Sequence, residues 1–596
     1  MPRFHRSRIA LGMLLIILVA GCGSPAPAAA PAATTVIRVT PEPLTTVVQE
    51  AAAALTPTDA PPATAQPPAA ASTATPSPKP SRGALGLEVE AGLPAQAGEQ
   101  VLAVLASGGP AEIVTAEADL RLTAQAAADA VMAWERVFTP VDRMSSILEG
   151  TTLDELKGAW TGEAASPNYT NIYIPEEILP DLTALLGAPG AAVKPQAADA
   201  VAEALWGDPM GLGIVPFESL TVRLRAIKLD AAWPTDNRFD AASWPLTARA
   251  YLAPLTERGR AELSRLAAAG LPVTNRDPGK LTVLVMTGVT AMARNSAVAT
   301  DRSGDDGFLA RQVGPELAAA DITIISNEIP FVEDCQADNS LNNLILCSRP
   351  GYFLNLELSG VDAIGLTGNH WNDFGYSNAL WSLEFYKSKQ IPVYGGGANE
   401  VDARKPLILE HNGNRLGFLG ANEWGPEWYR SGTGEQVSAW AGPDYPGSAR
   451  FVLEQMTADI AELKPRVDLV FAEVQHTEFN DAGDYQYEPI PTQEADFRAM
   501  SDAGADVVTG VMAHTPQAVE LRNGRLILYG LGNLYFDQTW SWPTRTGLVA
   551  RHTIYAGKLI NTELLVTVIQ DNFQLRWATP EERIQVLKIV FDLSRW

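Results

Sequence analysis

The chain reads Leu281-Thr282-Val283-Leu284-Val285-Met286-Thr287-Gly288, an apolar and β-branched run that stops at a polar tip. Such a run is typical of a buried strand. Runs of the same kind, each followed by polar or glycine-containing residues, occur at 322–325, 363–366, 467–472, 507–508 and 526–529. Because helical stretches separate these runs, the pattern predicts an α/β domain over residues 278–596.

Three of the chain's six histidines, His370, His476 and His514, lie on these polar tips. Ligands of α/β sheets gather beyond the carboxyl ends of the strands, so we expect the three side chains to meet at one crevice. A single histidine in such a place is more often a hydrogen-bonded structural residue or an exposed one. Three histidines at equivalent positions favour a functional cluster.

The order of these motifs from Leu281 to Asp537, with Gly395-Gly396-Gly397-Ala398-Asn399 and the segment 501–508 among them, resembles the CapA-type poly-γ-glutamate capsule synthesis proteins. That family is a branch of the calcineurin-like metallophosphoesterases. The resemblance implies a metallophosphoesterase-like β-sandwich flanked by helices, with a two-metal site at the strand ends. It also implies work on a capsule or cell-wall polymer, together with the machinery that synthesises the polymer.

The resemblance assigns roles to five residues of the polar tips. Glu328 corresponds to a carboxylate that bridges two metals. The other corresponding metal ligands are Asn369, His476 and His514. His370 corresponds to the catalytic acid near the leaving oxygen. Such ligands imply a divalent Mn, Fe or Zn ion as the cofactor.

Two positions depart from the family pattern. Val289 stands where the opening motif has a metal-binding aspartate, and Met512 stands where the last motif has its first histidine. Valine has no lone pair, and a thioether replaces imidazole poorly around a hard or borderline divalent ion. One metal position retains Glu328, Asn369 and His476, whereas the other retains little beyond Glu328 and His514. The sequence therefore predicts a degenerate metal site that holds one ion or none.

Cys335 and Cys347 lie twelve residues apart in a polar segment. In an exported protein, two such cysteines most economically form one disulfide that closes the loop between them. A pair of zinc ligands is the competing interpretation. Zinc sites usually bring cysteines at a spacing of about two to four residues with further ligands nearby, so we expect the disulfide.

The N-terminus predicts export and a lipid anchor. Basic residues precede the apolar run 9–20, which is too short for a transmembrane helix. The run ends in Val19-Ala20-Gly21-Cys22, which resembles a bacterial lipobox; a plain signal peptide with a chance cysteine is the alternative. The lipobox implies that residues 1–21 are removed and that lipid, palmitate included, on Cys22 holds the protein on the extracytoplasmic face of the cell membrane. Residues 22–84 are rich in Ala, Pro and Thr, which predicts a disordered tether.

Residues 85–277 have a globular composition and predict a smaller α/β domain. Thr152, three residues before Glu155, predicts a capped helix start, and 213–217 and 246–252 predict strands. Phrases in these segments loosely resemble periplasmic solute-binding proteins, which implies a ligand-binding lobe. A spacer or docking domain that binds no ligand is the alternative.

The formal charge of −25 argues against a nucleic-acid partner, because phosphate recognition requires a basic surface. Three functions remain. The first is a CapA-like protein with a degenerate metal site that acts in the synthesis, export or anchoring of a capsule or cell-wall polymer. The second is an active metal-dependent phosphoesterase or related hydrolase with one metal. The third is an extracytoplasmic solute-binding or sensor protein.

Four aromatic residues near the motif loops bear on the polymer. Trp371, Trp424, Trp428 and Tyr429 are able to stack on sugar rings, although packing in the core is the more common role of such residues.

Overall fold

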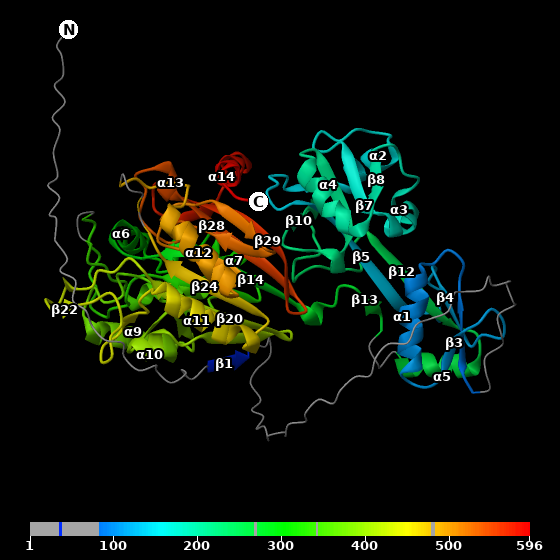
Figure 1. Cartoon of the computed structure of the whole chain (residues 1–596), viewed down its shortest axis with the longest axis horizontal. Helices are drawn as coiled ribbons and strands as arrows, with labels where there is room; N and C mark the ends of the chain where they lie inside the picture. The colour runs from blue at the N-terminus through cyan, green and yellow to red at the C-terminus, as the bar shows by residue number, and fades with distance from the viewer. Residues whose placement is uncertain (1–34, 39–82, 267–270, 341–343, 478, 480–482) are drawn as a thin grey trace, which may run out of the picture.

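The computed structural model of the chain describes residues 35–38, 83–266, 271–340, 344–477, 479 and 483–596. The predicted signal peptide, Cys22 and most of the predicted tether lie outside the described residues. The described part contains two α/β domains that lie side by side, the first on the right and the second on the left of Figure 1. None of its helices is long and apolar enough to cross a membrane.

The second domain contains two seven-stranded sheets. The strands of the first sheet are, in spatial order, β17 (Val393–Tyr394), β16 (Ala363–Gly365), β15 (Ile322–Asn327), β14 (Leu281–Thr290), β28 (Thr546–Tyr555), β29 (Lys558–Ile569) and β30 (Leu575–Trp577). The strands of the second sheet are β1 (Thr35–Arg38), β19 (Leu407–His411), β20 (Asn414–Asn422), β24 (Leu469–Gln475), β25 (Val507–Gly510), β27 (Arg525–Leu528) and β26 (Val519–Arg522).

The two sheets pack face to face. Met286 of β14 and Ile324 of β15 share a buried apolar cluster with Phe418 of β20 and Phe471 of β24. Successive side chains of a strand point to opposite faces, so the intervening residues form two outer cores under the helices. The predicted β-sandwich flanked by helices is confirmed.

Helices cover both outer faces of the sandwich, and α11 and α12 lie over the second sheet (Figure 1). The helices of this domain are α6 (Arg294–Ser303), α7 (Gly314–Leu317), α8 (Leu354–Leu358), α9 (Tyr376–Ser388), α10 (Glu400–Ala403), α11 (Leu453–Leu463), α12 (Pro491–Ala503), α13 (Trp542–Arg545) and α14 (Pro580–Asp592). Short strand pairs complete it: β18 (Gly396–Gly397) with β23 (Gly447–Ser448), and β21 (Tyr429–Arg430) with β22 (Gln436–Val437).

The central strands of each sheet run parallel to one another. In the first sheet β14, β15, β16 and β17 pair in parallel, and in the second β20, β24, β25 and β27 do so. The carboxyl ends of the strands of one parallel set lie at one edge of its sheet, where the intervening loops form a crevice. The polar tips predicted from the sequence follow these strands.

The first domain is built on one ten-stranded sheet. Its main path is β3 (Ala111–Ile113), β2 (Leu85–Val89), β4 (Leu120–Thr123), β12 (Thr247–Pro254), β5 (Val131–Arg143), β9 (Gly211–Pro216), β7 (Asn171–Pro175) and β8 (Val193–Gln196). Two further strands, β10 (Leu224–Ala226) and β13 (Val273–Thr274), pair with β5, and β6 (Gly150–Thr151) pairs with β11 (Lys228–Leu229). The helices are α1 (Ala95–Ala106), α2 (Leu153–Thr161), α3 (Leu179–Leu186), α4 (Val201–Gly207) and α5 (Glu257–Leu266).

Strand β5 passes through both halves of this domain. Its first part contributes Trp134 to a core under α1 and α5, and its second part contributes Phe138 and Val141 to a core under α2, α3 and α4. The local predictions hold here: the Thr152 hydroxyl accepts a hydrogen bond from Glu155 N at 3.1 Å, and the two predicted strands are β9 and β12.

The second half of the first domain is joined to the second domain by a shared core and by a buried ion pair. Val283 of β14 and Ile560 of β29 lie in the same apolar cluster as Phe138. Arg551 Nη2 lies 3.0 Å from Asp236 Oδ2, and the two side chains are 6% and 7% exposed. The domains therefore meet through an interface that combines apolar and charged contacts.

A strand also forms within the predicted tether. Thr35–Arg38 pairs in parallel with Leu407–Glu410 of β19 and so adds an edge strand to the second sheet. These four residues are therefore part of the second domain's sheet.

Candidate functional site

A cavity of about 670 Å³ opens at the strand ends of the second domain, and we call it the first cavity. It is lined by Arg294, Glu328, Leu344, Ile345, Leu346, Asn369, His370, Asp373, Trp424, Pro426, Tyr429, Phe479, Tyr485, Met512, His514, Phe536, Gln538 and Trp540. Four of the five predicted site residues are among them. Aromatic side chains supply much of the wall, and few charged groups reach it, which is the make-up of a site for an organic ligand.

Glu328 lies at the base of this cavity, directly after β15. Its side chain is 2% exposed, and its Oε2 accepts a hydrogen bond from Gln475 Nε2 at 3.0 Å. His370 Nε2 lies 3.7 Å from Oε1. Gly368 permits this approach, because a Cβ there would lie 2.4 Å from the Glu328 Cα and carbonyl oxygen.

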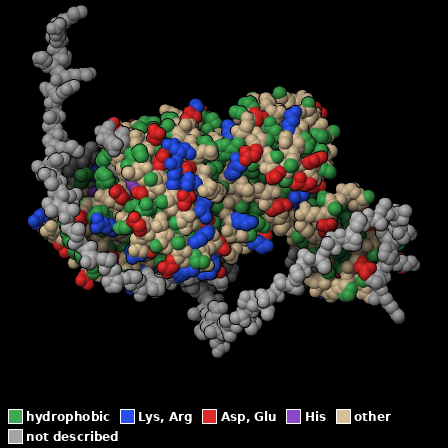
Figure 2. Space-filling view, in the orientation of Figure 1, with side chains coloured by type: hydrophobic (Ala, Val, Ile, Leu, Met, Phe, Trp, Pro, Cys, Tyr) green, Lys and Arg blue, Asp and Glu red, His purple; other side chains and the backbone are tan. Residues whose placement is uncertain are grey.

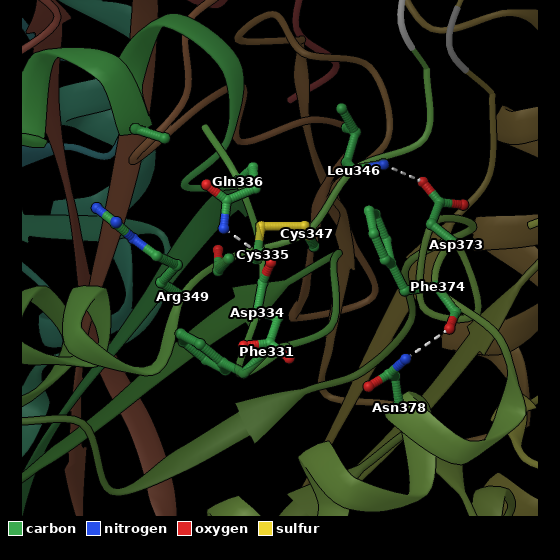
Figure 3. The surroundings of a disulfide bond; sticks show 12 residues. Phe331, Asp334, Cys335, Gln336, Leu346, Cys347, Arg349, Asp373, Phe374 and Asn378 are labelled. Carbon is green, nitrogen blue, oxygen red and sulfur yellow. Dashed lines mark hydrogen bonds between the residues drawn. A yellow bond between two sulfur atoms is a disulfide. The ribbon is translucent and has the colours of Figure 1, made fainter. Parts of the chain in front are cut away.

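Asp373 orients His370. Its Oδ2 lies 2.8 Å from His370 Nδ1. The Leu346 backbone N–H donates to the same oxygen at 2.6 Å, and Figure 3 shows this bond. Tyr429 O–H donates to Oδ1 at 2.9 Å; burial, and then the charge of Asp373, raise the pKa of Tyr429, so the phenol remains a donor. Because a carboxylate accepts hydrogen bonds, His370 donates through Nδ1 and directs Nε2 toward Glu328.

His514 is held as a neutral ring. Its Nδ1 lies 2.8 Å from Asn533 Oδ1, while Asn533 Nδ2 donates to Gln538 Oε1 at 3.1 Å and to the Thr544 carbonyl at 2.9 Å. The amide oxygen of Asn533 is therefore the acceptor, and His514 Nδ1 carries the proton. Burial lowers the pKa of His514 to about 4, so the ring is uncharged at neutral pH.

Asn369 brings an acceptor to the cavity. Its side chain is 6% exposed, and among the described residues its Oδ1 has no hydrogen-bond partner. A buried amide oxygen without a partner costs free energy, which a donor on a ligand would recover.

His476 lies outside the first cavity. Its ring packs against Phe451 and Phe497, and its Nε2 is 2.8 Å from Asp496 Oδ2. The preceding residue, Gln475, directs its side chain toward Glu328 instead. Successive residues at a strand end point to opposite sides, so the predicted ligand role of His476 is not met by this arrangement.

The residues at the cavity do not fit the implied two-metal centre. No group of three or more His, Cys, Asp or Glu side chains that could hold a metal ion occurs in the described part of the chain. Val289 is fully buried in an apolar core, and the thioether of Met512 lines the wall. A permanent cation, the Arg294 guanidinium, also reaches the cavity, where it is paired with the buried Asp537 at 2.5 Å.

Sequence reasoning missed several contributors to this site. Asp373 stands three residues after His370, and that spacing was a usable signal. Arg294 and Asp537 are 243 residues apart, and no local pattern links them. The contact of Gln475 with Glu328 was not predicted, because the adjacent His476 matched the family motif.

The first domain has a smaller cavity between its two cores, of about 260 Å³. Polar groups in it already satisfy one another: Arg136 Nη2 lies 3.0 Å from Glu218 Oε1, and Trp134 Nε1 donates to Gln100 Oε1 at 2.8 Å. Tyr555 of the second domain also lines it. These contacts give no support to a solute-binding role for this cavity.

The Gly368→Ala substitution is expected to lower the free energy of unfolding by about 2 kcal/mol, because the added methyl group overlaps the Glu328 backbone. Denaturant unfolding measures this change. Gly207→Ala is the matched control, since a Cβ at Gly207 has no atom within 4 Å. Equal stability of the two variants would contradict the close approach described above.

Residues 283–538 match the sequence model of the family described as bacterial capsule synthesis protein PGA_cap. The second domain is thus similar in sequence to capsule synthesis proteins of the CapA type. The chain is 28% identical over 287 residues to the capsule biosynthesis protein CapA of Bacillus anthracis, which covers 47% of this chain and 66% of the relative. It is 26% identical over 262 residues to the PGA biosynthesis protein CapA of Bacillus subtilis, with 44% and 65% covered. The chain spans just under two thirds of the length of these curated relatives.

Solved structures similar to part of the chain include an ABC-type phosphate transport receptor from Vibrio cholerae, at 12% identity and a TM-score of 0.26, with 31% of this chain and 92% of that chain covered. A putative phosphate ABC transporter substrate-binding protein from Clostridium perfringens has 10% identity and a TM-score of 0.21, with 30% and 91% covered.

Proposed function

We propose that this protein acts in the synthesis, export or anchoring of a capsule or cell-wall polymer, and that it binds the polymer in the first cavity without metal-dependent hydrolysis. The observation that supports the proposal is a cavity walled by aromatic side chains, into which Arg294, paired with Asp537, brings a permanent cation. Lipid on Cys22 would hold the protein on the extracytoplasmic face of the cell membrane, beside the synthesis machinery.

In this function the residues of the cavity orient the polymer. Asn369 Oδ1 accepts a hydrogen bond from a donor on the polymer, and Arg294 contributes the charge of its guanidinium to the cavity. Exposed aromatic side chains such as Trp424 and Trp540, which are 42% and 49% exposed, pack against the apolar parts of the bound polymer. The mixed polar and apolar wall suits a flexible polymer.

A second candidate function, hydrolysis, is favoured by one observation. The His370–Asp373 pair presents Nε2 beside Glu328, which is the arrangement of a histidine that gives or takes a proton at a bound group. In a hydrolytic reaction Glu328 would be the second group that gives or takes a proton. Measurements of polymer binding, metal content and hydrolysis on one protein preparation distinguish the two functions.

The test uses the full chain purified in detergent. The expected result is binding of poly-γ-glutamate, no stoichiometric Mn, Fe or Zn, and no phosphoester hydrolysis with or without added metal. The Val289→Asp and Met512→His double variant is the comparison, since it restores both family side chains. Metal-dependent hydrolysis by the unmodified chain, or absence of polymer binding, would overturn the proposal.

A further inference from the structure

The segment 424–429 separates the first cavity from a second one. Trp424, Pro426 and Tyr429 line the first cavity, whereas Glu427 and Trp428 line the other side. The second cavity has a volume of about 370 Å³. Its lining is Glu400, Arg404, Glu427, Trp428, Ser438, Trp440, Ala441, Gly442, Pro443, Tyr445, Ala449, Arg450, Val452 and Gln455. One short segment thus contributes aromatic rings to two adjoining sites.

Aromatic rings form the platform of the second cavity. Trp428 is 50% exposed, and its ring centroid lies 5.9 Å from that of Tyr445. Tyr445 stacks on Tyr376 at 5.0 Å, and Trp440 is fixed by a hydrogen bond from Nε1 to the Asn422 carbonyl at 3.0 Å. An exposed ring beside fixed rings is a preorganised surface for a flat apolar face, and it costs little conformational entropy on binding.

Charged groups of both signs surround this platform. The Arg450 guanidinium lies over the Trp440 ring, 4.3 Å from its centroid, and Arg404 is paired with Asp459 at 2.7 Å. Glu400 and Glu427 face the same space, and within the described part of the chain neither they nor Arg450 forms an ion pair. The rim therefore offers both donors and acceptors, and its charges nearly balance.

We propose that the second cavity is a saccharide-binding site that receives a pyranose ring against Trp428. The axial C–H groups of a pyranose carry a small positive charge and pack on the negative face of an aromatic ring. Its hydroxyl groups both donate and accept, so they pair with the carboxylates of Glu400 and Glu427 and with the Arg450 guanidinium. An acidic polypeptide pairs only with the arginine and is repelled by the two carboxylates.

This proposal does not depend on the function proposed for the first cavity, because it rests on a different set of side chains. The volume accommodates one or two sugar rings, so the ligand is a segment of a glycan chain. The protein would then bind a glycan in the second cavity, on one side of the segment 424–429, and the capsule or cell-wall polymer in the first cavity, on the other side.

The test measures binding of three probes to the full chain by calorimetry: the N-acetylglucosamine tetramer, maltotetraose and an oligomer of γ-linked glutamate. Trp428→Ala is the test variant, and Trp424→Ala is its matched control, since Trp424 is similarly exposed but lines the first cavity. The expected result is that at least one saccharide binds and that Trp428→Ala weakens its binding about tenfold, while Trp424→Ala leaves it unchanged.

Three outcomes would overturn the saccharide site. The first is that neither saccharide binds, and the second is that the two tryptophan variants weaken saccharide binding equally. The third is that the glutamate oligomer, rather than a saccharide, loses affinity in Trp428→Ala and Arg450→Gln. Failure of the proposed function is separate from these outcomes, because it would appear as no binding of the glutamate oligomer to the unmodified chain, whatever the saccharides do.

Discussion

Replacing Cys335 and Cys347 together by serine should lower the free energy of unfolding by about 3 kcal/mol and abolish ligand binding in the first cavity. The two sulfur atoms form a disulfide across a separation of twelve residues. Closing a loop of this size removes conformational entropy from the unfolded chain, which accounts for the expected loss. Both cysteines are also buried with Val332, against Phe374, so the substitution removes apolar contacts.

The effect on binding has a separate cause. Leu344 and Leu346, at the end of the disulfide loop, line the first cavity, and the Leu346 N–H donates to the Asp373 carboxylate that orients His370 (Figure 3). Releasing the loop therefore removes part of the wall and one partner of Asp373. Thermal unfolding and polymer binding measure the two effects.

The control for this prediction is chemical reduction. Dithiothreitol should reproduce both losses in the unmodified chain and should change nothing further in the double serine variant. If the serine variant retains the stability and the binding of the unmodified chain, the disulfide does not support the cavity wall.

The Asp236→Asn substitution should lower the free energy of unfolding by about 3 kcal/mol, because it removes the 3.0 Å ion pair of the buried Arg551 and leaves only the longer contact to Glu316 at 3.8 Å. A buried charge that loses its main partner costs more than the lost attraction alone. Asp236 also receives hydrogen bonds from Arg238, which links it to Glu316 of the second domain. Differential scanning calorimetry should show that the thermal unfolding transition of the two domains occurs at a lower temperature.

Asp199→Asn is the matched control, since Asp199 is an exposed aspartate of the same domain. It should leave the transition unchanged. An Asp236→Asn variant as stable as this control would show that the ion pair contributes nothing to the interface.

The same ion pair predicts a dependence on acid. Burial raises the pKa of Asp236, but the hydrogen bonds from Arg238 and the charge of Arg551 outweigh burial and lower the pKa to about 2. A folded-state pKa below the unfolded value of about 3.9 stabilises the protein above pH 4, and this stabilisation is lost as the pH falls from about 4 to 2. The lost free energy is about 2 kcal/mol, and it should be absent from the pH profile of Asp236→Asn.

The strands, their polar tips and several local features could be predicted from the sequence. Runs such as 281–288 are so apolar that only a buried strand accommodates them, and the spacing of Thr152 and Glu155 marks a helix start through one hydrogen bond. The disulfide could also be predicted, because Cys335 and Cys347 have no other cysteine near them in the sequence with which to pair.

The direction of side chains at strand ends could not be predicted. His476 and Gln475 are adjacent, and a shift of one residue decides which of them faces the cavity. The pairs Arg294–Asp537 and Asp236–Arg551 join residues 243 and 315 positions apart, and only the folded chain brings such groups together. The aromatic residues divided in the same way: Trp371 is fully buried, whereas Trp424 and Trp428 line the two cavities.

On the face drawn in Figure 2, basic side chains lie among acidic ones on both domains, so the net charge of −25 does not appear there as one large acidic field. A polyanion approaching this face would meet local patches of either sign. The net negative charge of the protein therefore repels an acidic polymer at this face less than the composition alone suggests.

Strand β5 has a mechanical consequence. It has 13 residues, and at a rise of about 3.3 Å per residue it extends over roughly 40 Å, with one register shift in its pairing with β12. The halves of the first domain share this strand, so they cannot rotate against one another unless ladder hydrogen bonds break. The second half is in turn bonded to the second domain through Asp236 and Arg551. We therefore expect the two halves of the first domain to move together rather than as two independent lobes.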